Sequence, residues 1–440
     1  MNLVFFFIVL ISFVFAGWHE IMTVPVEGAT APIEALSTAM IESAKGAVDL
    51  AIGLVGVMTL FLGLMKIAEA GGLLKVISRL LRPLMTRLFP DVPADHPAMG
   101  AMILNLSANV LGLGNAATPF GIRAMQELDA LNPEKGTATD AMVLFLAINT
   151  SSVTLLPTGV IALRAAAGSA DPAGILSTTL FATMGSTAVA IIAAKLYGRF
   201  SKLKQIKNNI HPQAADIRET ETPSNAEADV TVAEASGSYP LWVSILALGF
   251  LVAFIPLTVV YGKVISPWVI PSLMMGFLLF GVIRGVRIYE AFVEGAKEGF
   301  QVAVKIIPYL VAILVAVGMF RASGALDVMV NFLGGFTGKI GLPAEALPMA
   351  LLRPLSGSGA YGILASVIND PAIGPDSYVG YLVSTIQGST ETTFYVLAVY
   401  FGAVQVKRVR HALAAALTAD AAGVAFAVLS CWYLFGDKIR

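Results

Sequence analysis

The sequence predicts an all-α polytopic membrane protein, on three observations. Hydrophobic residues make up 57% of its 440 residues and charged residues only 13%, whereas soluble domains carry about 25% charged residues. Several apolar stretches reach the roughly 20 residues that a helix needs to cross a bilayer. The two halves of the chain also repeat each other in sequence, with polar interruptions at matching places.

The first half opens with residues 1–18, an apolar stretch ending in V-F-A-G. It lacks the positively charged start of a signal peptide, so we interpret it as the first helix and leave open whether it is cleaved. The other elements expected here are interfacial helices over 24–49 and 71–88 and spans over 50–68, 141–163 and 174–197.

Residues 198–239 differ in kind from the rest of the chain. They begin basic, then turn acidic and rich in Ala, Thr, Ser and Pro, with no periodic apolar face, which predicts a disordered linker. The linker separates a first repeat, 1–197, from a second, 240–440. In the second repeat we expect spans over 240–260, 267–283, 302–320 and 412–435, and amphipathic or interfacial helices over 284–300 and 322–340.

Two further apolar stretches are interrupted by glycine, proline and polar residues. Residues 98–125 contain N-L-S-A-N-V-L-G-L-G-N-A-A-T-P, and residues 347–368 contain R-P-L-S-G-S-G-A-Y-G. Non-helical backbone survives at membrane depth only where it lines a cavity or is buried in protein. We therefore predict two opposed re-entrant hairpins, each made of two half-helices around a tip.

Two longer apolar segments are interrupted as well. Asn149–Pro157 interrupts 141–163, and the run from Gln387 to Thr393 interrupts 378–404. A carboxylate at the centre of a span costs about 2.5–3.5 kcal/mol, so Glu391 should face protein, water or an ion. The pattern predicts two discontinuous transmembrane helices. The alternative is a polar seam of small and hydroxyl residues that joins helices together.

The repeat sets the expected topology. With an offset of 252 residues, Glu42 and Gly72 lie over Glu294 and Gly324, and smaller offsets of 241 and 238 align the interrupted stretches. We place the N-terminus in the cytoplasm and count the two hairpins as segments that do not cross the membrane. An odd number of spans then separates a residue of the first repeat from its mate in the second, and most Lys and Arg residues fall on the cytoplasmic side. We therefore predict two inverted structural repeats, with N-terminus and linker in the cytoplasm. Inverted repeats with discontinuous helices are the signature of secondary transporters.

Several other functions are disfavoured. The single cysteine, Cys431, gives no disulfide framework, and the four histidines lie far apart, so no metal site is expected. No nucleotide-binding loop appears, and no nucleic-acid partner is expected. Ser356 and Ser358 have no His or Lys base nearby in sequence, so we do not expect an enzyme. No cofactor is expected, apart from Na⁺ or H⁺ as a coupling ion.

The interrupted stretches resemble the nucleoside-recognition, or Gate, domain family. H-P-A-M-G-A-M-I-L-N-L-S-A-N-V-L-G-L-G-N-A-A-T-P-F-G-I in the first half is similar to spore maturation proteins A. R-P-L-S-G-S-G-A and Q-G-S-T-E-T-T-F-Y-V-L-A-V-Y-F-G in the second half are similar to spore maturation proteins B, so the chain resembles a fusion of the two. It is distantly similar to concentrative nucleoside transporters and to the membrane part of ferrous iron transporter B. By this resemblance the hairpin tips are Gly114–Pro119 and Ser356–Gly359, and the unwound helices are Asn149–Thr154 and Gln387–Thr392. The first tip has no acidic residue, which departs from the nucleoside transporters, so the substrate is not implied to be a nucleoside.

The candidate site lies between the repeats, where hairpin tips face unwound helices. Glu391 is the candidate ion ligand or proton carrier, with an ion pair to Arg353 as the alternative. Arg353 either binds an anionic group or anchors its hairpin, and Asp420 is expected to pack helices. The candidate substrate-binding residues are Asn115, Thr118, Asn149, Thr150, Ser151, Ser356, Ser358, Gln387, Thr390 and Glu391. The candidate ion-coupling residues are Glu391, Gln387, Ser389 and Thr392. For the uncharged residues the alternative is a set of hydrogen bonds between helices.

Two functions compete for this sequence. The first is a secondary transporter in a bacterial inner membrane, moving a small polar solute, of which a nucleoside-like molecule is one candidate, with Na⁺ or H⁺ coupling. The alternative is a non-transporting envelope factor of the spore-maturation type that keeps the Gate fold and binds a ligand or partner. In either case a homo-oligomer is expected.

Overall fold

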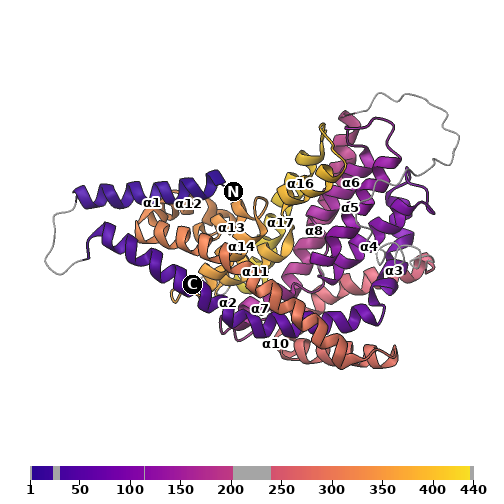
Figure 1. The fold of residues 1–440 in the computed structure, drawn as a ribbon, viewed down its shortest axis with the longest axis horizontal. Coiled ribbons are helices and arrows are strands. Elements are labelled where there is room, and N and C mark those ends of the chain that lie inside the picture. Colours follow the sequence, from indigo (N-terminus) through magenta and orange to yellow (C-terminus); the bar gives the residue numbers. More distant parts are fainter. Residues whose placement is uncertain (1, 23–29, 113, 202–238, 437–440) are drawn as a thin grey trace.

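The computed structural model describes residues 2–22, 30–112, 114–201 and 239–436, which fold into an assembly of helices (Figure 1). The helices of the first half are α1 (Asn2–Met22), α2 (Pro32–Ala70), α3 (Leu73–Leu88), α4 (Pro97–Leu111), α5 (Gly114–Ala130), α6 (Asp140–Thr150), α7 (Thr158–Ala166) and α8 (Leu176–Phe200). The second half contains α10 (Leu241–Ile283), α11 (Ile288–Ala322), α12 (Ala325–Thr337), α13 (Leu347–Leu352), α14 (Gly357–Ile368), α15 (Tyr378–Ser389), α16 (Thr393–Ala403) and α17 (Ala412–Phe435), with short 3-10 turns η1 (Gly338–Ile340) and η2 (Ala344–Ala346). In these ranges the one pairing of extended backbone is an isolated bridge between Thr137 and Arg408. The all-α prediction is confirmed.

The repeat-related helices α2 and α11 pack against each other in opposite directions. A Cβ on Gly295 of α11 would lie 2.5 Å from the Cβ of Lys66 in α2, and a Cβ on Gly318 would overlap the hydroxyl of Ser43. The two contacts are equivalent, because Lys66 and Gly318, and likewise Ser43 and Gly295, are 252 residues apart. The pair therefore has local two-fold symmetry. Glycine at both crossings lets the two backbones approach closely.

Three pairs of segments that the sequence suggested as separate are single helices. α2 joins the segments expected over 24–49 and 50–68, with residues 23–29 outside the described part; α10 joins 240–260 and 267–283; and α11 joins 284–300 and 302–320. The expectation of separate segments was wrong for a physical reason. Ending a helix leaves four N–H or C=O groups without partners, so a short polar interruption between two helical runs does not end the helix by itself.

The expected interruptions are present in all four places. α4 gives way to α5 after Gly112, whose φ of 79° is left-handed, and a Cβ on Gly112 would overlap the carbonyl oxygen of Leu156. α6 and α7 are separated by residues 151–157, which we call break 1, and α15 and α16 by residues 390–392, break 2. Residues 353–356 separate α13 from α14.

The positions of the two tips differ from those expected. The segment Gly114–Pro119 forms the first turns of α5, and Ser356 is the N-cap of α14. The helical interruptions therefore come earlier than the resemblance implied, after α4 at Gly112 and at 353–356, with residue 113 outside the described part. Ser356 is a helix N-cap and residues 114–119 form helical turns, so these small and polar residues start helices and are not unwound backbone.

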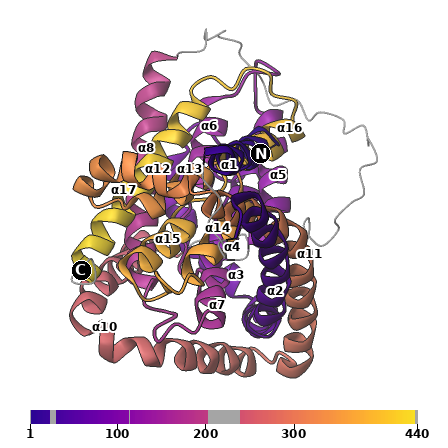
Figure 2. The same cartoon turned by 90° about the vertical axis from the view of Figure 1, so that its left-hand side faces the viewer.

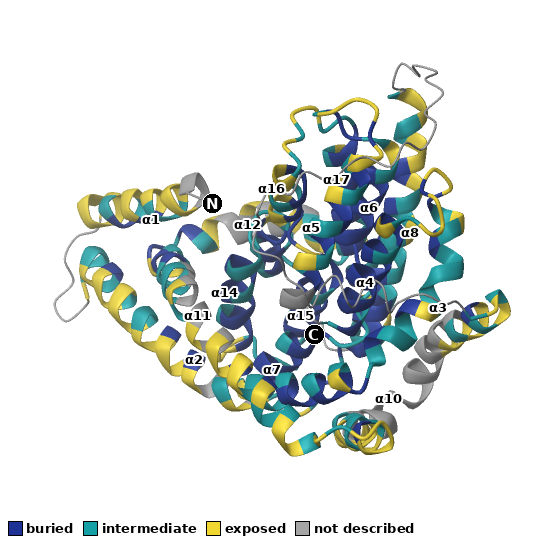
Figure 3. Ribbon diagram, turned by 45° about the vertical axis from the view of Figure 1, so that its right-hand side comes forward, coloured by how far each residue is buried: buried dark blue, intermediate teal, exposed yellow. Residues whose placement is uncertain are grey.

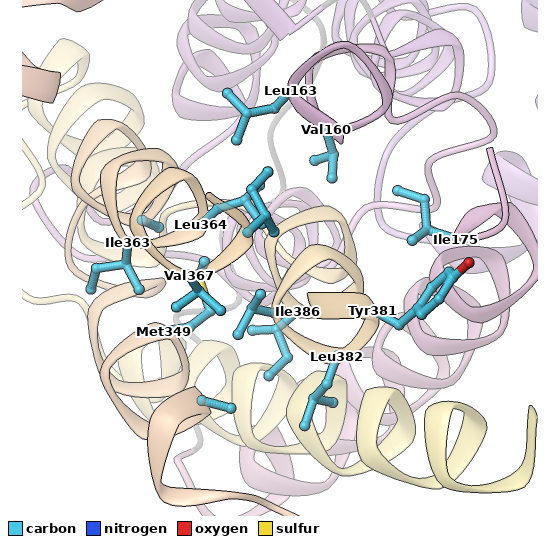
Figure 4. Close-up of a cluster of buried hydrophobic side chains, with 14 of the residues drawn as sticks. Val160, Leu163, Ile175, Met349, Ile363, Leu364, Val367, Tyr381, Leu382 and Ile386 are labelled. Atoms are coloured by element: carbon cyan, nitrogen blue, oxygen red, sulfur yellow. The ribbon is translucent and has the colours of Figure 1, made fainter. Parts of the chain in front are cut away.

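The buried core lies between the broken helices and α8 and α17. Figure 3 shows buried residues concentrated on α4, α6, α14 and α15, and exposed residues on α1, α2 and α10. One core cluster joins the two halves: Val160 and Ile175 pack with Ile363, Leu382 and Ile386 (Figure 4). Large apolar side chains on the outer helices are exposed, among them Phe6, Trp18, Trp242, Trp268 and Trp432. Such a surface suits contact with lipid.

Three helices of the described part are long and apolar enough to cross a membrane: 5–22 in α1, α8 and α17. α8 and α17 coincide closely with the spans expected over 174–197 and 412–435. Together with the composition, they identify a membrane protein. Nearly all of the expected linker, 202–238, lies outside the described residues, so the domain boundaries stay predictions.

Figure 2, a view from the end, shows α2 and α11 beside each other and α10 crossing the base of the assembly.

Candidate functional site

The two helix breaks, one from each half, meet through their backbones. The N–H of Glu391 in break 2 donates a hydrogen bond of 2.8 Å to the carbonyl oxygen of Thr150, the last residue of α6 before break 1. Both partners belong to segments that the sequence marked as unwound. The bond satisfies two backbone groups that helix ends otherwise leave without partners, so the breaks support each other.

Each break also pairs with the tip in its own half. In the first half, the Leu155 N–H donates to the Val110 carbonyl oxygen at 2.9 Å. In the second half, the Phe394 N–H, just after break 2, donates to the Pro354 carbonyl oxygen at 3.1 Å. In each half, one backbone hydrogen bond therefore links the region of the break to residues at or just before the tip.

Arg353, between α13 and α14, holds break 2 in place. Its Nε donates to the Gln387 carbonyl oxygen at 3.1 Å, its Nη1 donates to the Thr392 hydroxyl at 2.9 Å, and its Nη2 donates to the Thr390 carbonyl oxygen. The Arg353 side chain is 6% exposed. A guanidinium bonded to carbonyl oxygens at the end of α15 is favoured by the charge of that helix end.

Glu391 forms an ion pair with Arg353, with 3.7 Å between Oε2 and Nη2. The alternative raised from the sequence is therefore present in the structure. The Glu391 side chain is 48% exposed, so its carboxylate remains open to an ion or to solvent as well. This exposure keeps Glu391 available for the coupling role that the sequence suggested.

Several of the predicted hydroxyls make local bonds. Thr150 and Ser151 both donate to the Ala147 carbonyl oxygen, at 2.9 Å each, and Ser389 donates to the Ile386 carbonyl oxygen at 2.9 Å. Such bonds to the preceding turn are common for Ser and Thr inside helices, and each hydroxyl oxygen keeps lone pairs for a ligand.

The two serines of the second tip serve the start of α14. Ser356 accepts from the Gly359 N–H at 3.0 Å and lies 3.5 Å from the Ser358 hydroxyl. Thr118 is half-buried in α5. Asn115 also belongs to α5, but its side chain lies outside the described part. The structure does not join these four residues to break 2 through a side-chain bond that it describes.

Asn149 belongs to a buried cluster that includes a residue of the second half. Its Oδ1 accepts from Asn109 at 2.9 Å and from the Tyr400 hydroxyl at 3.4 Å. Asn105 donates to the same hydroxyl at 3.1 Å and to the Ala117 carbonyl oxygen at 2.8 Å. The cluster ties α4, α5 and α6 to α16. Tyr400 gave no signal in the sequence, because a tyrosine in an apolar helix is ordinary.

Buried oxygens without hydrogen-bond partners gather near the breaks. Within the described ranges they include Oε1 of Gln387, Oγ of Ser152, Oγ1 of Thr179 and Oδ1 of Asp420. Thr179 of α8 lies against the last turn of α15, where a Cβ on Gly388 would come within 3.2 Å of its Oγ1 and 3.4 Å of Pro157. Buried polar atoms are normally bonded. The Gln387 and Asp420 oxygens can accept hydrogen bonds from a ligand, and the Ser152 and Thr179 hydroxyls can donate or accept them.

Two Arg–Asp clasps join the halves outside this region. Arg164 of α7 is fully buried and bonds Asp376 at 3.0 Å, while stacking on Tyr381 at 4.3 Å from the ring centroid. Arg410, before α17, bonds Asp140 at the start of α6 at 2.7 Å. Each clasp pairs an arginine of one half with an aspartate of the other. The sequence showed Arg164 only as a charge near a span and gave no sign of its partner.

In the part of the chain that the structure describes, no three His, Cys, Asp or Glu side chains are grouped to hold a metal ion. Cys431 is a free, buried thiol in α17.

Comparison with known proteins gives matches in both halves. Residues 51–168 and 303–407 match the Gate family, described as nucleoside recognition. The chain is 49% identical over 168 residues to spore maturation protein B of Bacillus subtilis (strain 168), covering 38% of this chain and 93% of that protein. It is 47% identical over 165 residues to spore maturation protein A of the same organism, covering 38% of this chain and 84% of that protein. These matches are consistent with a fusion of the two. No solved structure matches the chain.

Proposed function

Because the chain belongs to the nucleoside-recognition (Gate) family, we propose that it is a secondary transporter of a small polar solute, coupled to Na⁺ or H⁺. The solute site lies between the two breaks and the two tips. The protein resides in a bacterial inner membrane, with its N-terminus and linker in the cytoplasm, and works as a homo-oligomer.

The observation that carries this proposal is the hydrogen bond from the Glu391 N–H to the Thr150 carbonyl oxygen. It joins break 2 in one repeat to the end of α6, directly before break 1, in the other. In secondary transporters, discontinuous helices from two repeats meet at the substrate site near the middle of the membrane. The bond between break 2 and the residue before break 1 supports such an arrangement here.

The packing of α2 on α11 supports an inverted relation between the repeats. Equivalent helices that run in opposite directions around a local two-fold axis have opposite orientations across a membrane. Alternating access in such proteins moves one repeat against the other around a fixed site. The four interrupted elements then correspond to two opposed re-entrant hairpins and two discontinuous transmembrane helices.

The chemistry of the site suggests the class of solute. In the described residues near the breaks, buried oxygens of Gln387, Ser152 and Thr179 have no hydrogen-bond partner; the amide oxygen accepts hydrogen bonds, and the two hydroxyls both donate and accept them. A solute rich in hydroxyl or amine donors, such as a nucleoside or a similar polar molecule, matches them. The substrate-binding residues proposed are those identified from the sequence, with Gln387 and Thr390 nearest to Arg353, and Glu391 is proposed as an ion-coupling residue with Gln387, Ser389 and Thr392.

The second candidate is a non-transporting membrane factor of the spore-maturation type. The ion pair between Arg353 and Glu391 favours it, because the pair accounts for Glu391 without a coupling ion. In that case the breaks would hold a rigid ligand-binding or partner-binding surface, and no solute would cross the membrane.

Uptake into proteoliposomes separates the two. Purified protein is first screened by thermal shift with nucleosides, short peptides, carboxylates and divalent metals, with and without Na⁺ and across pH. Solutes that stabilise the protein are then tested for uptake under a Na⁺ or pH gradient. Gradient-driven uptake by the wild type is expected, with at least a tenfold loss in Glu391→Gln.

Glu134→Gln is the matched control. Glu134 pairs with Arg408 at 3.7 Å and its side chain is 46% exposed. It therefore has the same pair distance as Glu391 and nearly the same exposure, but it lies in the loop between α5 and α6. Uptake by Glu134→Gln should match the wild type. A panel with no stabilising solute and no uptake would favour the non-transporting factor.

A further inference from the structure

Asp420 of α17 is a buried carboxylate that the proposed solute site does not use. Its residue is 4% exposed. Oδ2 accepts a 2.7 Å hydrogen bond from the hydroxyl of Thr393, the first residue of α16 after break 2. Oδ1 has no hydrogen-bond partner within the described ranges. The group therefore lies directly beside the break and is bonded to it through one hydroxyl.

The surroundings of Asp420 leave its charge uncompensated. The charge of Arg353 acts on it, but the guanidinium is bonded to Gln387, Thr390 and Thr392 and forms no described ion pair with Asp420. No arginine, lysine or histidine of the described part forms an ion pair with Asp420. An ionised carboxylate without a cation is costly to bury, particularly within a membrane span.

Other titratable groups on the elements around α17 do not change this. The described charged groups on α8 and α6 are Lys195, Arg199 and Asp140. The tyrosines on α8, α15 and α16 are Tyr197, which bonds the Thr418 hydroxyl at 3.1 Å, and Tyr378, Tyr381, Tyr395 and Tyr400. His411 and Arg410 precede α17 on the chain. None of these donates a hydrogen bond to the Asp420 carboxylate in the part of the chain that the structure describes.

This face of α17 also contacts break 2 and α8 at Gly423. A Cβ on Gly423, one turn after Asp420, would lie 2.6 Å from Cγ2 of Thr390 and 3.4 Å from Oγ of Ser186. Asp420 and Gly423 thus place one face of α17 against both ends of break 2. A change in the charge of Asp420 would alter the Thr393 hydrogen bond and so the start of α16.

We propose that Asp420 binds and releases the coupling proton, with Thr393 transmitting its protonation state to break 2. This inference rests on the proposed transport function and adds a proton site that is separate from Glu391. On binding, a proton from water forms an O–H bond at Oδ1. On release the proton returns to water, and the bond from the Thr393 hydroxyl to Oδ2 becomes charge-assisted and therefore stronger. The one hydrogen-bond partner of the Asp420 carboxyl group is the donating hydroxyl of Thr393. This environment suits binding of a proton and not of a metal ion, because a metal ion requires several oxygen ligands.

Infrared difference spectroscopy of the reconstituted protein, between acidic and alkaline buffer, tests the proposal directly. The wild type and Glu391→Gln should both lose a carboxylic-acid C=O band in alkaline buffer. Asp420→Asn should lack that band, and Asp140→Asn, which changes an exposed carboxylate, should keep it. Persistence of the band in folded Asp420→Asn would overturn the assignment.

Thr393→Val provides a second test that keeps the carboxyl group in place. It removes the hydroxyl with little change in volume, so the band should persist but shift in frequency, because Oδ2 loses its hydrogen bond. An unshifted band would overturn the coupling through Thr393. If the band is assigned to Asp420 but no solute of the panel moves under a pH gradient, the transport function fails while the proton site stands.

Discussion

Gly72 and its repeat mate Gly324 adopt the same left-handed conformation at the ends of two repeat-related helices. Their φ values are 82° and 77°. The Gly72 N–H donates to the Glu69 carbonyl oxygen and the Gly324 N–H to the Arg321 carbonyl oxygen, at 2.8 and 3.0 Å. These acceptors are also 252 residues apart. The repeat seen in the sequence therefore holds at the level of single hydrogen bonds.

This conformation predicts that Gly72→Ala and Gly324→Ala each lower the free energy of unfolding. A residue with a Cβ pays about 1–2 kcal/mol in the left-handed region. Unfolding in detergent, followed by circular dichroism, would measure the loss. Gly249→Ala in α10 is the control, since this glycine has an ordinary φ and nothing within 4 Å of a new Cβ. Equal losses in all three variants would contradict the prediction.

Arg353→Ala should destabilise the protein more than any change at an exposed arginine. It removes three hydrogen bonds to break 2 and leaves buried carbonyl oxygens without donors, at a cost of about 3 kcal/mol. Arg321→Ala is the control: Arg321 is 43% exposed and pairs with Asp370, and such pairs contribute about 0–1 kcal/mol. Thermal unfolding of both variants under one condition makes the comparison. Similar midpoints would show that Arg353 does not hold break 2.

The two Arg–Asp clasps should differ in strength. Asp376→Asn removes the carboxylate that pairs with the fully buried Arg164, and an uncompensated buried charge costs on the order of 3 kcal/mol. In the other clasp the Asp140 side chain is 60% exposed, so Asp140→Asn should cost about 1 kcal/mol or less. Denaturation midpoints of the two variants provide the measurement. A reversed order would mean that the buried clasp is satisfied by its other contacts.

Tyr400→Phe should weaken the contact between α16 and the first half. The hydroxyl accepts from Asn105 and donates to Asn149, and each such bond contributes about 1 kcal/mol. Tyr395→Phe, on the same helix but with an exposed ring, is the control and should leave stability unchanged. Chemical unfolding curves would separate the two variants, and coincident curves would contradict the role of the cluster.

The sequence predicted where the chain is interrupted but not what holds the interruptions. Runs of polar residues in apolar segments located both breaks, because such residues are costly in lipid wherever they fall. The hydrogen bond between Thr393 and Asp420 and the clamp by Arg353 depend on segments that meet only in the folded protein. No local sequence pattern indicates which distant residues will be partners. The same limit applies to α10, where a short polar interruption suggested two spans and the helix is continuous.

The 39 residues of α2, at 1.5 Å each, span about 58 Å. The hydrocarbon layer is about 30 Å thick, so α2 would need a tilt of about 60° to remain inside it, whereas membrane helices tilt by about 0–40°. If α2 crosses the bilayer, one of its ends leaves the layer, as the interfacial segment expected over 24–49 would, or the bilayer around it thickens. The same holds for α11, which is 35 residues long and packs along α2. The protein should consequently respond to lipid thickness: its thermal stability in vesicles should rise with acyl-chain length, and short-chain lipids should destabilise it.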